Sequence, residues 1–427
     1  MEVTNPKRVS NQAVAATTFA PARAVAAEPG LSPKLRQRID SQFRERWEKE
    51  WGKKFVTHGV VPGPDAVRLD GNDYLAVTGH QDIVNAQLAA LRCNEEFVVQ
   101  SGVFQMDGSP SSRFEAGLAN FVGKEGALLC QSGYTANLGL IQVIADPETP
   151  VYLDSLAHMS LWEGVRAAGA PAQAFRHNDP GHLARMIKRH GPGLVIVDSV
   201  YSTTGAICPL LEIVEVAEQN GCMILVDESH SLGTHGPQGR GLCAELDLTH
   251  RVHFITASLA KAFAGRAGFF TMPNELRHYL MCHSYPSIFS SCLLPHEIAG
   301  LAATLDLVER SDEARVQLRR NTQRLRQAFS DAGFPIHHGS EQIISLEAGA
   351  ESDTLALRDK LETRGVFGAV FCAPATSRNR AMVRLTLNSA LTDAEMGHVE
   401  AVAQELAPLV KPWDWPIARR QRAAAAS

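Results

Sequence analysis

A lysine with apolar neighbours is the first residue of this sequence that could do chemistry. Lys261 lies in residues 256–265, directly after a predicted strand, and alanine, leucine and phenylalanine surround it. A buried ammonium without a partner is costly, so either the side chain reaches the surface or the amine has a chemical task. The chemical interpretation is a desolvated lysine that forms a Schiff base with a carbonyl compound.

A second group of polar residues follows another apolar run. Residues 223–226 are apolar and lead into Asp227, Glu228, Ser229 and His230. Such a strand could bind Mg²⁺ in a P-loop ATPase, but that hypothesis needs a G-x-x-x-x-G-K-[ST] loop, which the sequence lacks. The alternative is a carboxylate that pairs with a protonated ring nitrogen. That carboxylate and a Schiff-base lysine are the two groups that a protein supplies to the chemistry of pyridoxal phosphate (PLP).

A Ser-Gly turn supplies a candidate phosphate site. Ser132, Gly133 and Tyr134 follow the predicted strand 127–131 and open a helix. The free N–H groups and the dipole of a helix N-terminus favour an anion. An ordinary N-cap would look the same, so this turn alone leaves both interpretations open.

These residues need a sheet that brings the ends of several strands together. Apolar, β-rich runs alternate with helical patterns such as 180–190 and 209–220, and the runs cover residues 127–131, 151–154, 194–198, 223–227, 253–257 and 267–272. The alternation predicts an α/β fold, a mostly parallel sheet with helices on both faces. In such sheets ligands bind beyond the carboxyl ends of the strands, where these polar residues lie.

The two ends of the chain differ from this middle part. Residues 1–30 are Ala-rich and predict a flexible arm, and residues 34–50 predict an exposed helix. After Pro295 we expect a smaller α+β domain. Its predicted elements are a long amphipathic helix over 296–332, strands over 342–347 and 382–387, and helices over 353–364 and 393–408.

Composition excludes several classes of protein. The net charge of −5 gives no general basic field for a phosphate backbone, so nucleic acid is not expected as a partner. No apolar run reaches the roughly 18 residues that span a membrane, and polar residues and Pro21 interrupt the Ala-rich segment 11–28, against a signal peptide. The eight cysteines form no C-x-x-C pair, so we expect no metal site of that spacing, and reduced thiols indicate a cytoplasmic protein.

Longer motifs give a resemblance to a known family. Residues 226–241, VDESHSLGTHGPQGRG, resemble the aspartate–histidine motif of the α-oxoamine synthases, which are PLP enzymes of fold type I. Residues 258–261 resemble their lysine motif, and the match runs in register from about residue 65 to 410. The resemblance implies a large PLP-binding domain over 65–295 with a seven-stranded, mostly parallel sheet. It also implies a small C-terminal domain over 296–427 and an arm over 1–64.

Departures from the common pattern narrow the subfamily. The family has alanine where Ser229 stands and Val-Leu where Thr234 and His235 stand. These departures, taken together with three further segments, make the sequence resemble the α-hydroxyketone quorum-sensing autoinducer synthases. The three segments are residues 108–113, 157–164 and 371–377. The sequence gives no physical role for Ser229 or His235.

The resemblance assigns roles residue by residue. It implies catalytic roles for Lys261, Asp227, His230 and His158. In this assignment Lys261 holds PLP and takes the Cα proton, Asp227 faces the ring nitrogen, and His158 stacks on the ring. Cofactor contacts are implied for Ser132, Gly133, Tyr134, His158, Ser202, Asp227, His230, Ser258 and Lys261, with Ser290 and Ser291 reaching the phosphate of a neighbouring subunit. Arg384 matches the arginine that takes the amino-acid carboxylate, and Asn72 is a further candidate for the substrate side. Taken singly, either histidine could be structural and Arg384 could be a surface ion pair.

The implied reaction is a decarboxylating Claisen-type condensation in a homodimer whose sites lie near the subunit interface. A medium-chain fatty acyl-CoA would join 2-aminobutyrate or S-adenosylmethionine to give an α-aminoketone, the precursor of a hydroxyketone signal. Four phenylalanines, Phe104, Phe263, Phe289 and Phe371, could line an acyl tunnel or belong to the core. Two alternatives stay open: a housekeeping α-oxoamine synthase (2-amino-3-ketobutyrate ligase, 8-amino-7-oxononanoate synthase or 5-aminolevulinate synthase) and a non-catalytic regulator with the PLP fold.

Overall fold

The computed structural model describes residues 30–53, 59–93, 99–336, 339 and 342–425. The chain divides into two compact units, residues 1–53 and 54–427, and each is described by itself. The Ala-rich segment 1–29, predicted as an arm, lies outside the described residues. In the first unit, α1 (Pro33–Ile39), a π-helical turn (Asp40–Arg44) and α2 (Glu45–Lys49) follow one another with no buried residue, which confirms the exposed helix predicted there.

The second unit contains the strands and most of the helices. Its strands are β1 (Val67–Leu69), β2 (Gly126–Cys130), β3 (Val151–Asp154), β4 (Ala172–Phe175), β5 (Leu194–Asp198), β6 (Met223–Asp227), β7 (Phe254–Ser258), β8 (Gly268–Met272), β9 (Ile343–Gly349), β10 (Val366–Phe371) and β11 (Ala381–Thr386). Its helices are α3 (Gln81–Arg92), α4 (Pro110–Val122), α5 (Gly133–Ile144), α6 (Met159–Ala168), α7 (Pro180–His190), α8 (Leu210–Gln219), α9 (Leu242–Glu245), α10 (Arg277–His283), α11 (Tyr285–Phe289), α12 (Pro295–Glu309), α13 (Asp312–Asp331), α14 (Glu351–Glu362), α15 (Asp393–Val410) and α16 (Pro416–Ala425).

Seven strands form one sheet in the order β2-β8-β7-β6-β5-β3-β4. The pairs from β7 to β4 are parallel, and β8 runs antiparallel to both of its neighbours. Asp198 is in register with Asp227, and Asp227 with Thr256. This arrangement confirms the predicted α/β fold with a mostly parallel seven-stranded sheet, and it brings the ends of β5, β6 and β7 together.

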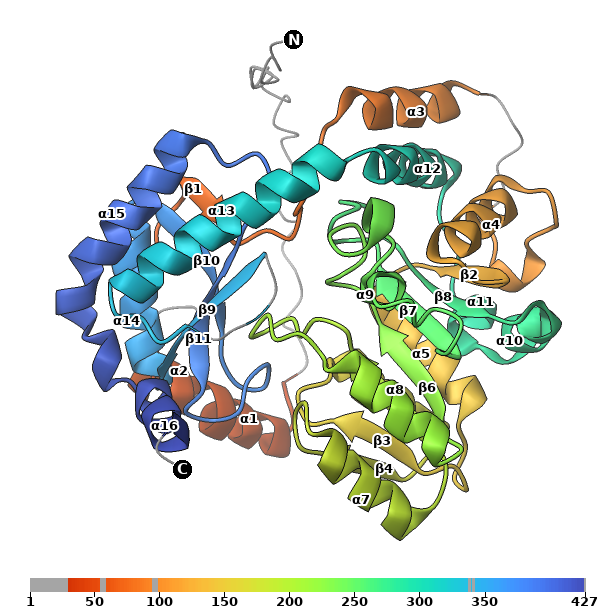
Figure 1. The fold of residues 1–427 in the computed structure, drawn as a ribbon, viewed down its shortest axis with the longest axis horizontal. Coiled ribbons are helices and arrows are strands. Elements are labelled where there is room, and N and C mark those ends of the chain that lie inside the picture. Colours follow the sequence, from red (N-terminus) through yellow and green to blue (C-terminus); the bar gives the residue numbers. More distant parts are fainter. Residues whose placement is uncertain (1–29, 54–58, 94–98, 337–338, 340–341, 426–427) are drawn as a thin grey trace. The chain divides into compact units, whose positions relative to one another are not determined.

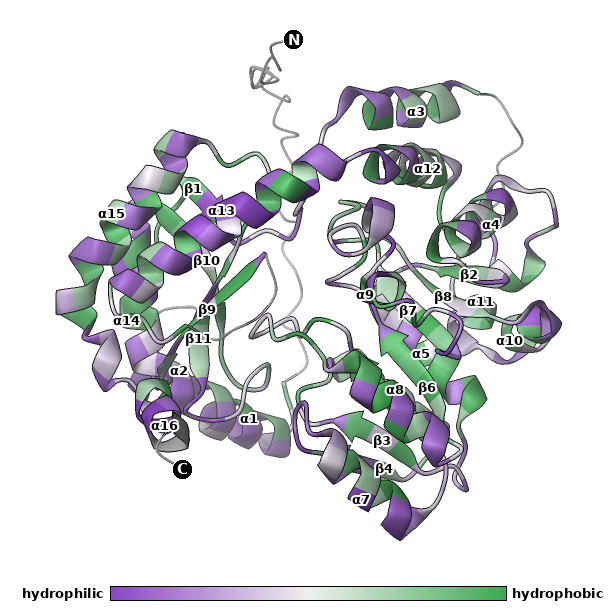
Figure 2. Ribbon diagram, in the orientation of Figure 1, coloured by the Kyte–Doolittle hydropathy of each residue, from purple (hydrophilic) through white to green (hydrophobic). Residues whose placement is uncertain are grey.

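Helices cover both faces of this sheet because its strands are apolar on both sides. Alternate side chains of β5 and β6 enter two separate cores, one formed with α5 and α6 and the other with α7 and α8. Figure 1 shows α5 on the opposite side of the sheet from α8. Figure 2 shows the same central strands coloured as hydrophobic, while the helices carry hydrophilic outer sides.

The C-terminal residues build a second sheet of four strands in the order β1-β10-β11-β9. Strand β1 comes from the start of the unit and pairs in parallel with β10, so residues 67–69 belong to this sheet and not to the seven-stranded one. Helices α13, α14 and α15 pack with these strands around one core. A domain boundary near residue 295 stays a prediction, because residues 54–427 form one compact unit.

The single helix predicted over 296–332 is wrong, since the structure has α12 and α13 with a break at Arg310 and Ser311. The buried guanidinium of Arg315 stabilises this break by donating to the carbonyl oxygens of Val308 (2.8 Å) and Glu309 (3.4 Å) in the last turn of α12. No helix among the described residues is long and apolar enough to cross a membrane.

Candidate cofactor and substrate site

Asp227, the last residue of β6, is a buried carboxylate held from two sides. The side-chain amide of Asn137 donates to its Oδ2 at 2.7 Å, and the backbone N–H of Ser229 donates to its Oδ1 at 2.8 Å. Asn137 lies on α5 and also donates to the Ser160 hydroxyl at 2.9 Å. These two hydrogen bonds fix the orientation of the Asp227 carboxylate at the end of β6.

Lys261 lies in the tight turn between β7 and β8. Two backbone bonds close this turn, from Leu259 N to Ala267 O and from Gly265 N to Leu259 O, both at 2.9 Å. Burial and, to a smaller extent, the charge of Arg384 lower the pKa of Lys261 to about 8, while the charge of Asp227 opposes this shift. A lysine of this pKa has a substantial neutral fraction near neutral pH, as a nucleophilic amine requires.

The start of α5 forms a cradle together with the end of β7. The Ser132 hydroxyl caps the helix by accepting from Thr135 N at 3.2 Å, and none of the described hydrogen bonds uses the N–H groups of Gly133 and Tyr134. A Cβ atom at Gly133 would lie 2.6 Å from the Cβ of Ser258, so only glycine allows the helix to begin this close to the strand. Two free N–H groups at a helix N-terminus beside Ser258 suit a phosphate.

His158 caps α6 beside Asp227 and Lys261. Its backbone N–H donates to Asp198 Oδ2 at 3.0 Å, and its Nδ1 lies 2.7 Å from the Ser160 hydroxyl. Desolvation lowers the pKa of His158, Asp227 raises it, and Lys261 lowers it, which places the imidazole within reach of both charges. The residue keeps an exposed part although its surroundings partly desolvate the imidazole, so the ring can meet a planar ligand.

His230 is fully enclosed instead. Its Nδ1 lies 2.5 Å from the Tyr74 hydroxyl, and its backbone carbonyl accepts from the Gln342 amide. Burial holds the pKa of His230 well below its usual range, and the charges of Lys261 and Arg384 lower it further. A neutral imidazole whose one nitrogen is bound to Tyr74 leaves its other nitrogen for a ligand.

Arg384 on β11 is a buried guanidinium with an exposed fraction of 4%. Its Nη1 donates to the Ser202 carbonyl at 2.8 Å and its Nη2 donates to Asn72 Oδ1 at 3.0 Å, while Nε has no partner among the described residues. The Phe371 ring covers one face at 4.6 Å. This geometry removes the alternative of a surface ion pair. Because no described carboxylate neutralises Arg384, the site favours a substrate carboxylate.

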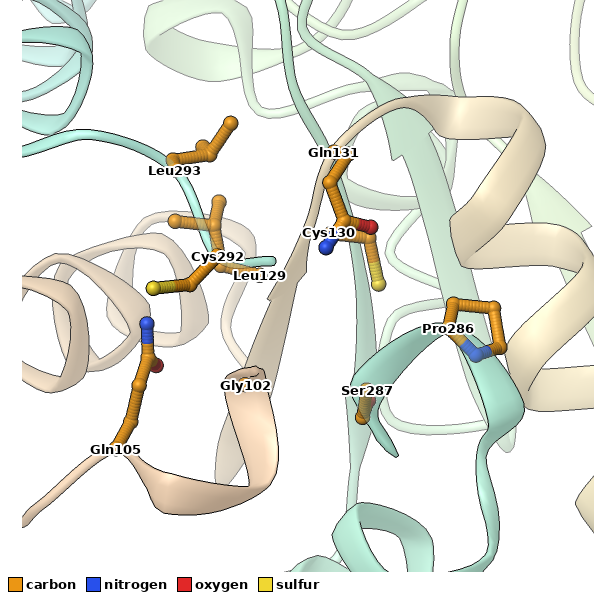
Figure 3. Close-up of a pocket in the computed structure, with 9 residues that line it drawn as sticks. All are labelled: Gly102, Gln105, Leu129, Cys130, Gln131, Pro286, Ser287, Cys292 and Leu293. Carbon is orange, nitrogen blue, oxygen red and sulfur yellow. The ribbon is translucent and has the colours of Figure 1, made fainter. Parts of the chain in front are cut away.

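Ser290 and Ser291 follow α11, and Ser291 contacts Gln131, the residue directly before Ser132 in the cradle. Ser291 forms an isolated bridge with Ser101, and its carbonyl accepts from the Gln131 amide at 2.6 Å. A small pocket lies here, lined by Gly102, Gln105, Leu129, Cys130, Gln131, Pro286, Ser287, Cys292 and Leu293 (Figure 3). Whether the two serines reach a phosphate of another subunit stays a prediction.

The structure adds four residues that the sequence did not single out: Asn137, Tyr74, Ser160 and Asp198. Each hydrogen-bonds to a predicted site residue. Of the four tunnel candidates, Phe263 is core, Phe371 covers Arg384, and Phe104 and Phe289 are 66% and 77% exposed. Ser229, unexplained from the sequence, accepts a hydrogen bond from Ser258 N at 2.8 Å.

A lysine of lowered pKa, a fixed carboxylate, a glycine cradle and a seven-stranded sheet with one antiparallel strand together define a PLP-dependent enzyme of the aminotransferase fold. The sequence model of the family described as aminotransferase class I and II matches residues 64–401. The chain belongs to this family and, within it, to the α-oxoamine synthases, which are PLP-dependent acyltransferases.

Individual relatives agree with this assignment. The chain is 45% identical to CAI-1 autoinducer synthase of Vibrio campbellii over 86% of its own length and 93% of that protein. It is 30% identical to serine palmitoyltransferase of Caulobacter vibrioides over 80% of its length and 86% of that protein. Among solved structures it is similar to a Sphingomonas wittichii serine palmitoyltransferase, with a TM-score of 0.82, 25% identity, and coverage of 88% of this chain and 99% of that one.

Proposed function

We propose that this enzyme joins a medium-chain fatty acyl-CoA to a small amino donor, 2-aminobutyrate or S-adenosylmethionine, and makes the α-aminoketone precursor of an α-hydroxyketone autoinducer. A carbon–carbon bond forms between the donor's Cα and the acyl carbonyl. The thioester bond breaks to release CoA, and the donor's carboxylate leaves as CO₂. The observation that carries this proposal is the 45% identity with a CAI-1 autoinducer synthase over 93% of that protein.

The chain's own residues support each part of this chemistry. Bound PLP supplies the electron sink that stabilises negative charge at Cα. Asp227, fixed by Asn137, would keep the ring nitrogen of PLP protonated. Lys261 would hold PLP and then take the Cα proton on its Nζ, a task that its pKa of about 8 suits. Arg384 would bind the donor's carboxylate, with Asn72 holding the guanidinium in place.

The remaining predicted residues would bind and orient the cofactor. His158 would stack on the ring, and His230 and Ser202 would donate to its phenolic oxygen. The phosphate would be bound by Ser132, Gly133, Tyr134 and Ser258, together with Ser290 and Ser291 of a second subunit in a homodimer. Exposed apolar side chains on residues 102–106 and 285–289 support such a dimer, because large exposed apolar patches mark interaction sites.

Product analysis tests the proposed function. The purified holoenzyme is given an equimolar pool of acyl-CoAs from acetyl to long-chain, with mixed amino acids and S-adenosylmethionine, and the products are identified by mass spectrometry. Lys261→Ala, which lacks the reactive amine, is the control. Aminoketones with a medium acyl chain are expected. A strong preference for acetyl-, pimeloyl- or succinyl-CoA would instead favour a housekeeping synthase, and no condensation product with intact PLP binding would favour the non-catalytic regulator.

A further inference from the structure

Ser229 lies where the hydrogen-bond ladder between β6 and β7 stops. The ladder's last regular bond runs from Glu228 N to Thr256 O at 2.7 Å. In a continuing parallel ladder the next bond would run from Ser258 N to Glu228 O. That carbonyl accepts from Leu232 N at 2.8 Å instead, because the chain turns away from the sheet. Ser258 N donates to the Ser229 hydroxyl at 2.8 Å, so a side-chain oxygen replaces the missing carbonyl.

The same residue also holds Asp227. The backbone N–H of Ser229 donates to Asp227 Oδ1 at 2.8 Å, so Ser229 is bonded both to the carboxylate at the end of β6 and to the backbone at the end of β7. Any residue except proline provides the first bond through its backbone N–H, but only a side chain with an acceptor provides the second. An alanine would leave the N–H of Ser258 without this acceptor, which is unfavourable in a partly buried position.

The position of Ser258 matters because the backbone segments of the phosphate cradle are in close contact there. A Cβ at Gly133 would lie 2.6 Å from Ser258 Cβ and 2.8 Å from its Cα, and a Cβ at Gly268 would lie 2.3 Å from Gly133 N. Three chain segments therefore meet at close backbone distance, and a small displacement of Ser258 moves one wall of the cradle. We propose that Ser229 is a positioning residue that fixes Ser258, and through it the phosphate cradle, relative to Asp227.

This proposal rests on the PLP site and not on the identity of either substrate, so it is tested by cofactor binding alone. Apoprotein of the wild type and of Ser229→Ala is titrated with PLP, and separately with pyridoxal, which has the same ring and aldehyde but no phosphate. We expect Ser229→Ala to weaken PLP binding about tenfold, which corresponds to about 1.4 kcal/mol, and to change pyridoxal binding less than twofold. A loss of general structure would weaken both ligands alike, and that result, or unchanged PLP affinity, would overturn the proposal.

Two further variants complete the test. Ser231→Ala is the matched control, since Ser231 is a nearby buried serine whose hydroxyl donates to Glu228 Oε2 at 2.6 Å and has no hydrogen bond to β7 among the described residues. It should cost stability but leave the ratio of PLP to pyridoxal affinity within twofold of the wild type. Ser229→Thr keeps an acceptor oxygen and should bind PLP within about threefold of the wild type. If this variant binds PLP as weakly as Ser229→Ala, or if Ser231→Ala changes the ratio equally, the positioning role is refuted.

Discussion

The lowered pKa of Lys261 predicts how fast the apoprotein captures its cofactor. The pKa falls from 10.5 to about 8, chiefly by burial. At pH 7 an amine of pKa 10.5 is neutral in about 0.03% of molecules and one of pKa 8 in about 9%, so the reactive fraction is about 300-fold larger. The rate at which PLP binds covalently, followed by its visible absorption, should rise with pH up to about 8 and then level off.

Two substitutions should move this inflection in opposite directions. Arg384→Gln removes a positive charge that lowers the pKa of Lys261, so the inflection moves to higher pH; Asp227→Asn removes the opposing negative charge and moves it to lower pH. PLP's own titration is common to all variants. Arg251→Gln, which disrupts a surface pair with Glu218, should leave the inflection in place. An inflection near 10.5, or shifts of the same sign in both site variants, would refute the reasoning.

The same shift affects stability, and its sign follows from proton counting. Between pH 8 and 10.5 the unfolded chain keeps the Lys261 proton that the folded apoprotein has released. The unfolded state therefore binds more protons, and this group makes the apoprotein more stable as the pH rises through that window.

Three substitutions give further predictions. Arg384→Gln should lower kcat/KM for the amino donor about 100-fold, from two charge-assisted hydrogen bonds of about 1.5 kcal/mol each, and leave the KM for acyl-CoA unchanged in steady-state assays. Phe371→Leu removes the ring over that guanidinium and should raise the donor's KM about two- to fivefold; an unchanged KM would contradict this contact's role. Tyr74→Phe leaves His230 without its partner and should lower the free energy of unfolding by about 1–2 kcal/mol in urea.

Much of the large sheet could be predicted because buried parallel strands are short, continuous apolar runs. The predicted strands end within one residue of β2, β3, β5, β6, β7 and β8. Strand β4 was missed because it is a four-residue edge strand with one buried side chain. The break between α12 and α13 was missed because helix-forming residues continue through it, although Ser311 followed by two acidic residues is a cap signal.

The sequence alone indicates a candidate site where residue type points to chemistry, as at Lys261 and Asp227. The site was not predictable where the chemistry depends on contacts between distant residues. Asn137 meets Asp227 across 90 positions of sequence and Tyr74 meets His230 across 156, and no periodicity encodes such pairs. Similarly, a sequence cannot tell whether Arg384 has an acidic neighbour, because that neighbour could come from any segment.

The antiparallel strand β8 also sets an order of events during synthesis. It pairs with β2, whose partner residues lie about 140 positions earlier, as in Gly126 with Met272. The two sides of the cradle at the start of α5, Gly133 and Ser258, are likewise separated in sequence by most of the large sheet. Contacts so far apart in sequence form late and slowly, so we expect a ribosome-bound chain to bind PLP only after residue 272 has emerged. Cofactor binding would then report completion of this sheet, and a chain truncated before β8 should not retain PLP.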